Sequence, residues 1–458
     1  MQDVDRKQLQ IENEDAARAR RLQWRIFWVA LIVRLLAMTL GQTWRIRDFE
    51  DHFRFGGEMA RISRALVTGY GYADPFMGHT GPSAWSPPLY VLLIAGVFKV
   101  FGVYTAVSAW VILALNCVMS AATAVAVYEI GWRCFDRRVA LWSGWMWALH
   151  PAAMQYAVKW IWEMSATTML LAWILVLALR MRGVGETTGD GQRWGRWAWF
   201  GLLWGVLALT GTTPLILLPA VLVWLLWPQR KRLAVGLAKA SLAGVMIFAV
   251  VAPWAARNWV VFHRFIPFRS NFGAENYLGN GPWSVGFPWG RTVPLENHRI
   301  LREYADMGEA EWVADRGAKA QVWIKAHRVR YLQLAVKRAY MYWWSVPHPL
   351  GEGALAEYMR EISYSFLSLA GGFGVLLAVR RRRPAAWVFL SAFLLLPIPY
   401  YFVTVQPRFR HMLEPLICVL GVYLFQSAEP GRFGRAVAGW FGWFGRLTAS
   451  WQPWFTGR

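Results

Sequence analysis

The sequence predicts an all-α, polytopic membrane protein, and two observations carry that prediction. Of the 458 residues, 56% are hydrophobic and 31 are tryptophan, and the mean hydropathy of +0.28 is too high for an ordinary soluble domain. Apolar runs of the length that a membrane helix needs recur along most of the chain, and lysine and arginine gather between them. Such a chain crosses a membrane several times.

The net charge and the cysteines bear on which partners and metal sites the protein could have. The formal net charge is +22, but no nucleic-acid-binding motif accompanies it. Basic membrane proteins carry such an excess in cytoplasmic loops, so we expect no nucleic-acid partner. Cys117, Cys134 and Cys418 are far apart in the sequence and form no metal-binding spacing, which predicts neither a disulfide framework nor a zinc site.

The basic loops predict an orientation. Arg18, Arg20, Arg21 and Arg25 precede the first apolar run, which places the N-terminus in the cytoplasm and the following loop outside. We expect residues 129–138, 182–195, 228–235 and 380–384 inside, and residues 44–104 and 253–360 outside. The predicted spans number about ten: 27–41, 105–128, 139–150, 164–180, 197–211, 214–227, 236–252, 361–379, 385–400 and 412–426.

These signals divide the chain into five parts. They are a cytoplasmic basic arm (1–26), an N-terminal transmembrane module (27–252) that includes an acidic first outer loop (42–104), an extracytoplasmic segment (253–360), C-terminal transmembrane helices (361–426) and a cytoplasmic tail (427–458). The apolar run Pro88–Phe101 is too short for an ordinary span of about twenty residues. We therefore expect it to be an interfacial or re-entrant helix.

The first outer loop carries a cluster of acids. Asp48, Glu50, Asp51 and Glu58 lie close together, and Ile62 follows Glu58 at the i+4 spacing of an amphipathic helix. Carboxylates held at membrane depth are functional candidates by default. Asp48 and Glu50 have an alternative role, because either could pair with a neighbouring arginine on a solvated face.

Two further outer loops add polar candidates. One contains Lys159 and Glu163, and the other contains Arg408, Arg410 and His411. Arg408 and Arg410 oppose the positive-inside bias, which favours a ligand-binding role, whereas Lys159 could simply extend from a helix end to water. Carboxylates and arginines on one side of the membrane suit a reaction in which a lipid phosphate leaves and a base removes a proton from an attacking hydroxyl.

The order of these motifs resembles a known family. An acidic first outer loop, then PPLY with a short helix ending FKVFG, then an acid after His150-Pro151, is similar to the polytopic GT-C glycosyltransferases. Within that family, the sequence most resembles the bacterial branch related to protein O-mannosyltransferases and aminoarabinose transferases. PWAARN at 253–258, RSNFGAENYLGN at 269–280 and RFRHMLEP at 408–415 extend the resemblance over most of the chain. It implies a GT-C-like bundle of about 10–12 transmembrane helices.

The resemblance also implies roles for single residues. Asp51 matches the first-loop acid that acts as base, with Glu58 as second candidate and Asp48 as the fallback. Glu163 matches the second-loop acid, which in some relatives helps to hold a divalent cation, here together with Asp51 and His52. For the donor phosphate the candidates are Arg408, Arg410, Lys159 and Arg257, although Arg257 could cap a helix instead.

The expected function is that of an inverting glycosyltransferase. Its donor would be a polyprenyl-phosphate sugar, its acceptor a hydroxyl of a lipid, glycan or protein, and its active site would face the extracytoplasmic side of a bacterial inner membrane. No cofactor is certain, and a divalent cation is an open alternative. A lipid-linked glycan ligase or polymerase is the nearer rival, and a secondary transporter the more distant one, although no internal repeat is visible.

Overall fold

The computed structural model describes residues 2–46, 55–185, 193–287, 294, 297–345 and 354–427. These residues form helices and no strand. The helices are α1 (Gln2–Leu40), α3 (Glu58–Val67), α4 (Pro88–Phe101), α5 (Ala106–Cys134), α6 (Arg137–Leu149), α7 (Pro151–Val158), α8 (Met164–Met181), α9 (Trp194–Ala208), η3 (Thr213–Leu217), α10 (Leu218–Leu226), η4 (Trp227–Arg232), α11 (Leu233–Phe262), α12 (Phe272–Gly279), α13 (His298–Met307), α14 (Glu309–Ala326), α15 (Arg328–Trp344), α16 (Ala354–Arg380), α17 (Ala386–Leu395), α18 (Ile398–Phe402), η6 (Pro407–Leu413) and α19 (Glu414–Gln426).

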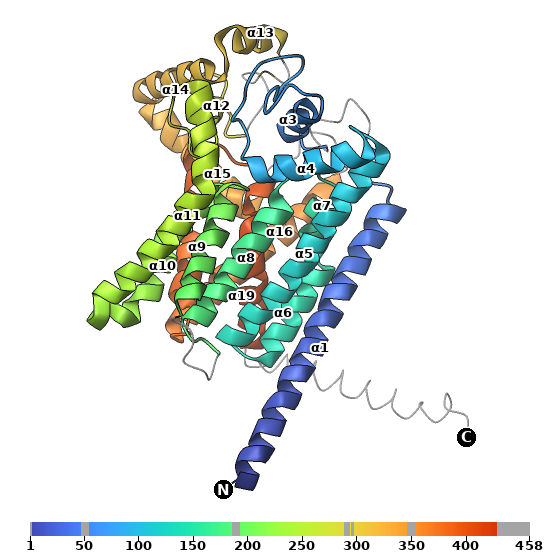
Figure 1. Cartoon of the computed structure of the whole chain (residues 1–458), viewed down its shortest axis with the longest axis vertical. Coiled ribbons are helices and arrows are strands. Elements are labelled where there is room, and N and C mark those ends of the chain that lie inside the picture. The colour runs from blue at the N-terminus through green and yellow to red at the C-terminus, as the bar shows by residue number, and fades with distance from the viewer. Residues whose placement is uncertain are drawn as a thin grey trace.

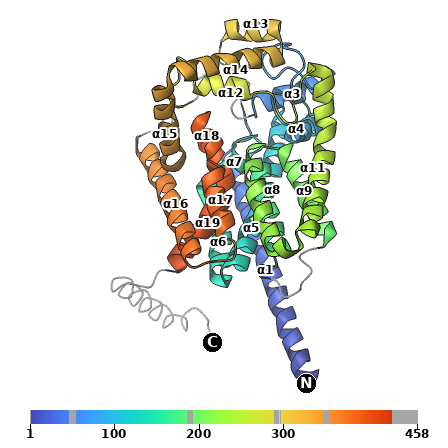
Figure 2. The ribbon, with the colours of Figure 1, turned by 90° about the vertical axis from the view of Figure 1, so that its left-hand side faces the viewer.

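A bundle of apolar helices forms the body of the molecule (Figures 1 and 2). α5 packs against α1, α6 and α8, α9 packs against α11, and α16 packs against α19. Every predicted span overlaps helices of the structure, although 214–227 is divided between η3 and α10 and 385–400 between α17 and α18. Within the described residues, five helices are long and apolar enough to cross a membrane unaided. The prediction of a multi-pass, all-α membrane protein is therefore confirmed.

Small residues let helices approach closely where two pairs of them meet. A Cβ at Gly201 of α9 would overlap the carbonyl oxygen of Ala243 on α11. In the same way, a Cβ at Gly374 of α16 would overlap the carbonyl oxygen of Leu420 on α19. Lipid tails are as apolar as leucine, so membrane helices associate through such close packing more than through hydrophobic burial. A larger side chain at either glycine would separate its helix pair.

A cap of shorter helices covers one end of the bundle. Figure 1 shows α3, α12, α13 and α14 at the end opposite the N-terminus, with α4 running across the bundle below α3. α3 packs against α4, and α12 against α14. The position of α4 agrees with the interfacial helix expected from the short run Pro88–Phe101.

Three helix ends differ from their expected positions. α5 continues to Cys134, so the basic turn is shorter than expected, and Asp136 caps α6 by accepting from the amides of Arg138 (2.8 Å) and Val139 (2.9 Å). α11 passes through Pro253 to Phe262, because neighbouring helices can stabilise a proline inside a membrane helix. α16 begins at Ala354, ahead of the expected residue 361.

One buried carboxylate joins three segments of the cap. Glu309, at the start of α14, accepts hydrogen bonds from Ser270 Oγ (2.6 Å), the Ala84 amide (2.6 Å), Ser83 Oγ (2.6 Å) and Tyr304 Oη (2.8 Å). Its side chain is only 2% exposed. Because Ala84 and Ser270 each lie one residue from a residue that lines the cavity described below, this carboxylate fixes the walls of that cavity.

Candidate functional site

A cavity of about 330 Å³ lies where the cap meets the bundle. It is bounded by the first outer loop, the start of α8, the turn before η3, α12 and η6. The charged side chains that line it are of both signs, and most come from segments far apart in the sequence. They are Glu58, Glu163, Arg269, Glu275 and Arg408. Three carboxylates and two guanidinium groups therefore share one pocket.

Two glycines bring the first of these acids to the cavity. Gly56 and Gly57 both have positive φ angles, +89° and +50°, in the region that favours glycine. A Cβ at Gly56 would also overlap the carbonyl oxygen of Ile161, so only glycine lets the first outer loop approach the second this closely. Glu58, one of the acids that the sequence singled out, follows at the first position of α3 and lines the cavity.

Glu163 precedes the first residue of α8 and lines the same cavity. Burial raises the pKa of its carboxyl above the usual value near 4.5, the Arg408 guanidinium counteracts part of that shift, and Glu58 adds to it. A buried carboxyl with a raised pKa beside a second carboxylate is typical of a site that handles protons. This pairing agrees with the expectation that acids from the first two outer loops converge.

Arg408 lies over an aromatic ring at the cavity wall. Its guanidinium carbon is 3.8 Å from the centroid of the Trp162 ring, a cation–π contact. Burial lowers the pKa of Arg408, while Glu163, Glu58 and Glu275, in that order, oppose the shift. The guanidinium is thus held in place by stacking and surrounded by acids.

The sequence prediction missed Arg269 and Glu275. Both line the cavity from the segment around α12, and the Nε atom of Arg269 is buried without a hydrogen-bond partner. Burial raises the pKa of Glu275, and Arg269 lowers it. The signal was present, because RSNFGAENYLGN begins at Arg269 and includes Glu275, but that motif served only to support the family resemblance.

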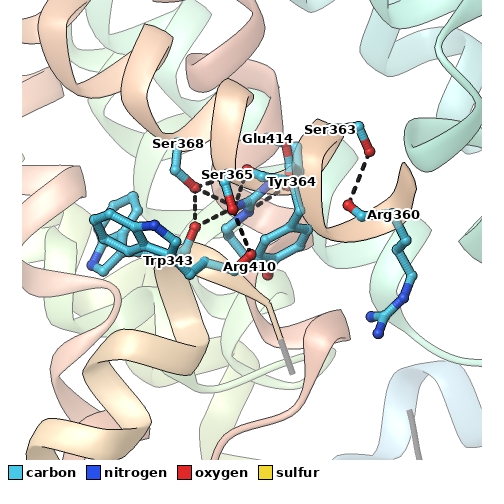
Figure 3. A network of polar contacts seen from close by, with 9 residues as sticks. Trp343, Arg360, Ser363, Tyr364, Ser365, Ser368, Arg410 and Glu414 are labelled. Carbon is cyan, nitrogen blue, oxygen red and sulfur yellow. Dashed lines mark hydrogen bonds and ion pairs between the residues drawn. The ribbon is translucent and has the colours of Figure 1, made fainter. Parts of the chain in front are cut away.

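Arg410 lies outside this cavity lining, although it is two residues from Arg408. Its side chain is 1% exposed and is held by protein groups: Nε donates to Glu414 Oε1 (2.6 Å), and Nη1 donates to Ser368 Oγ (2.5 Å) and to the Tyr364 carbonyl (3.1 Å). Figure 3 shows the guanidinium among these groups. Its donors are directed from η6 at α16 and α19 rather than into the cavity.

The other predicted phosphate ligands also have protein contacts. Arg257 donates to the carbonyls of Ser83 (2.6 Å) and Tyr72 (2.8 Å) and so ties α11 to the first outer loop. Lys159 ends α7, and its Nζ lies 5.7 Å from the centroid of the Trp160 ring. Neither residue lines the cavity.

Asp48, Asp51 and His52 lie outside the described residues. Within the described ranges, no group of three or more histidine, cysteine or acidic side chains is arranged to hold a metal ion. The proposed metal ligand set of Glu163, Asp51 and His52 therefore has only Glu163 in the described part of the chain.

The overall fold is similar to that of solved oligosaccharyltransferases. The apo crystal structure of the enzyme from Archaeoglobus fulgidus aligns over 88% of this chain and 50% of its own, with a TM-score of 0.52 and 15% identity. The complex of the archaeal AglB from the same organism with an inhibitory peptide and a dolichol-phosphate gives 0.51 and 15%, again over 88% and 50%. Both have the GT-C fold, and the present chain is a polytopic membrane protein of that fold class.

A family comparison points the same way. Residues 86–256 match the family model described as dolichyl-phosphate-mannose-protein mannosyltransferase. ArnT from Cupriavidus metallidurans bound to undecaprenyl phosphate aligns over 88% of this chain and 80% of its own at 15% identity, with a TM-score of 0.38. No curated protein sequence matches the chain significantly. The fold shared with the two archaeal structures confirms the GT-C resemblance, and the chain spans half the length of those structures.

Proposed function

We propose that this protein is an inverting glycosyltransferase that moves a sugar from a polyprenyl-phosphate donor to a hydroxyl acceptor. The observation that carries the proposal is the convergence of Arg408 and Arg269 with Glu58 and Glu163 on one cavity next to apolar helices. Guanidinium groups match the oxygens of a phosphate, carboxylates remove protons, and the bundle offers a surface for a lipid chain. The family match to residues 86–256 supports the same chemistry.

In the proposed reaction the acceptor oxygen attacks the anomeric carbon from the face opposite the phosphate. The new carbon–oxygen bond forms as the bond to the phosphate oxygen breaks, so the configuration inverts and the electron pair leaves with the polyprenyl phosphate. Arg408 and Arg269 stabilise the negative charge that develops on that phosphate. A cavity carboxylate accepts the hydroxyl proton.

The base is one of the first-loop acids. Glu58 is the candidate that lines the cavity, and Asp51 and Asp48 precede it in the same loop. Glu163, whose pKa is raised by burial, would position the acceptor or share the proton. Any cation would be held by Glu163 with Asp51 and His52 and would supply extra positive charge for the leaving phosphate.

The same proposal places the cavity on the extracytoplasmic face of a bacterial inner membrane. The cap lies opposite the N-terminus, and the basic loops favour a cytoplasmic N-terminus (Figure 1). The acceptor class that the matched family and the peptide-bound AglB support best is a protein hydroxyl, with lipid and glycan hydroxyls as alternatives.

The size of the cavity favours a single sugar. Small-molecule sites usually measure about 300–1,000 Å³, and this cavity of about 330 Å³ lies at the lower end. A lipid-linked glycan ligase or polymerase would have to accommodate several sugars. A transporter would have no need for a carboxylate beside the phosphate-binding arginines.

Transfer of label by the purified protein in nanodiscs tests the proposal. Polyprenyl-phosphate mannose carrying a radiolabelled sugar, mixed with a membrane extract as acceptor source, should yield labelled product. Glu58→Gln, Asp51→Asn and Asp48→Asn are compared, and loss of the base should lower kcat by about two to four orders of magnitude. Transfer only from pyrophosphate-linked oligosaccharides would identify a ligase, and solute flux in proteoliposomes without transfer would identify a transporter.

A further inference from the structure

One motif from the sequence analysis is only partly explained by the cavity. RSNFGAENYLGN supplies Arg269 and Glu275 to the lining. It ends in Gly279, the last residue of α12, and Asn280, which are buried but lie outside the lining. The contacts of these two residues lead to a second segment of the cavity wall.

The end of α12 lies directly against the chain that follows α18. A Cβ at Gly279 would overlap the carbonyl oxygen of Val403, so only glycine allows this approach of the two backbones. The Asn280 side chain adds a hydrogen bond to the same segment, because its Nδ2 donates to the Phe402 carbonyl (2.8 Å). The cavity lining begins immediately beside these contacts, since it includes Leu278 and Val403.

Arg338 of α15 joins the same two segments. α15 packs against α18 (Figure 2), and the Arg338 side chain is 0% exposed. Its Nη2 donates to the Gly279 carbonyl and to Asn280 Oδ1 (2.8 Å). Its Nη1 donates to the Tyr401 carbonyl (3.1 Å). Because the planar guanidinium fixes the directions of its donors, one side chain holds the end of α12 to α18.

Charges carried by these segments act on each other in the cavity. Glu275 lies on α12, Arg269 precedes that helix, and Arg408 lies on η6, which follows α18. Burial raises the pKa of Glu275, and Arg269 and Arg408 lower it. Such interactions weaken with distance. The placement of α12 relative to η6 therefore sets the electrostatics of the cavity.

We propose that Arg338 and Asn280 are positioning residues, which hold α12 at the distance from α18 and η6 that the reaction requires. This inference rests on the proposed function, in which Arg269 and Arg408 stabilise the same leaving phosphate. If α12 moves away from η6, the two guanidinium groups no longer converge on one phosphate. A displacement of about 1 Å can cost about a hundredfold in rate.

Arg34 provides a matched control inside the bundle. Like Arg338, it is 0% exposed and donates to neutral groups. These include the carbonyls of Ala148 (2.8 Å) and Trp147 (2.9 Å) and Ser120 Oγ (3.0 Å), none of which lies in or next to the cavity lining. Arg34→Gln and Arg338→Gln should therefore both lower stability, whereas only Arg338→Gln should move α12.

Spin labels on the two segments measure that movement without any transfer reaction. Phe272→Cys on α12 and Phe402→Cys on α18 replace exposed side chains, and the three native cysteines are buried. In the full chain in nanodiscs, the distribution of label distances should shift or broaden in Arg338→Gln and stay unchanged in Arg34→Gln. An unchanged distribution in folded Arg338→Gln would overturn the proposal.

Asn280→Asp covers the case in which Arg338→Gln does not fold. The aspartate keeps an oxygen for Arg338 but removes the Nδ2 donor to the Phe402 carbonyl. The buried guanidinium thus keeps its partner while α12 loses one contact with α18. The label distances should change less than in Arg338→Gln but remain distinct from those of the wild type. Wild-type distances in Asn280→Asp would contradict the positioning role.

The transfer assay supplies the functional readout. Donor kcat/KM should be about ten- to hundredfold lower in Arg338→Gln than in Arg34→Gln. Adding Arg269→Gln should cost less in Arg338→Gln than in the wild type, because Arg269 is already displaced, and should cost the full amount in Arg34→Gln. Additive losses in Arg338→Gln would overturn the proposal. Absence of transfer by the wild type would refute the proposed function, whereas unchanged label distances would refute the hold of Arg338 on α12, so the two failures are distinguishable.

Discussion

Two arginines that are two residues apart on η6 have opposite surroundings. Arg408 lines the cavity, stacks on Trp162 and faces three carboxylates from other segments. Arg410 is buried and directs its donors at Glu414, Ser368 and the Tyr364 carbonyl (Figure 3). The same residue type in the same motif thus supplies a cavity-lining charge in one case and a structural contact in the other.

The geometry of η6 explains the difference. A 3₁₀ helix has three residues per turn, so side chains two positions apart point in directions about 120° from each other. One direction leads to the cavity and the other into the contact between α16 and α19. An arginine that opposes the positive-inside prediction can therefore be a buried structural residue as readily as a cavity-lining one.

The largest expected effect comes from Arg410→Ala. It leaves Glu414 buried without its cation, and breaking a buried ion pair in this way usually costs about 3–5 kcal/mol. Thermal unfolding in detergent should show a clear loss of stability. Arg410→Met combined with Glu414→Leu should recover most of the loss, because it removes both charges. A stable Arg410→Ala protein that fails only in donor use would reverse the distinction between the two arginines.

Arg408→Ala should instead affect the reaction. A charge-assisted hydrogen bond to phosphate contributes about 1.5–3 kcal/mol, so donor kcat/KM should fall about ten- to hundredfold while the unfolding midpoint stays within a few degrees. Arg408→Lys should restore activity only in part, since lysine lacks the planar fork. Unchanged donor kinetics in Arg408→Ala would leave Arg269 as the phosphate ligand.

Glu309→Gln tests whether a structural contact behind the cavity wall also affects donor binding. The amide keeps one oxygen but directs an NH₂ group toward donors such as the Ala84 amide, which cannot reverse its role. We expect about 1–3 kcal/mol lower stability. The donor KM should also rise, because Ser270 is adjacent to Arg269. An intact KM in a destabilised variant would confine Glu309 to the fold.

The smallest effect concerns Glu163 and depends on pH. Burial raises the pKa of its carboxyl in the folded protein, so the ionised form costs stability above that pKa, and the cost disappears as the pH falls toward 4.5. Glu163→Gln should therefore raise the unfolding midpoint by about 1–2 °C at pH 7. The gain should vanish near pH 4.5. A constant gain at both pH values would mean that packing, not charge, is responsible.

The sequence carried most of the fold because membrane helices are specified locally. Apolar length and flanking arginines identified the helices and the short helix α4, and the order of acidic loops identified the GT-C class. The helix ends were predicted less accurately. For example, α11 continues through Pro253, because contacts with neighbouring helices decide whether a proline is tolerated inside a helix.

The site could be predicted only in part. Glu58, Glu163 and Arg408 were found because each stands out against apolar neighbours, and the structure brings all three to one cavity. Arg269 and Glu275 lie in a polar segment where a charge attracts no notice. Tertiary contacts, such as the hydrogen bond from Ser270 to Glu309, place these two residues at the cavity, and no local sequence pattern reveals such contacts.

The stacking of Arg408 on Trp162 has a further consequence for proton uptake. Trp162 is adjacent to Glu163, and Arg408 is the cation that most stabilises the ionised form of that acid. A phosphate that engages Arg408 withdraws part of this stabilisation and adds negative charge nearby, so Glu163 should bind a proton more tightly once the donor is in place. By thermodynamic reciprocity, the donor should then bind more tightly as the pH falls. On the proposed function, the contact between Arg408 and Trp162 would couple the arrival of the lipid phosphate to the protonation of Glu163.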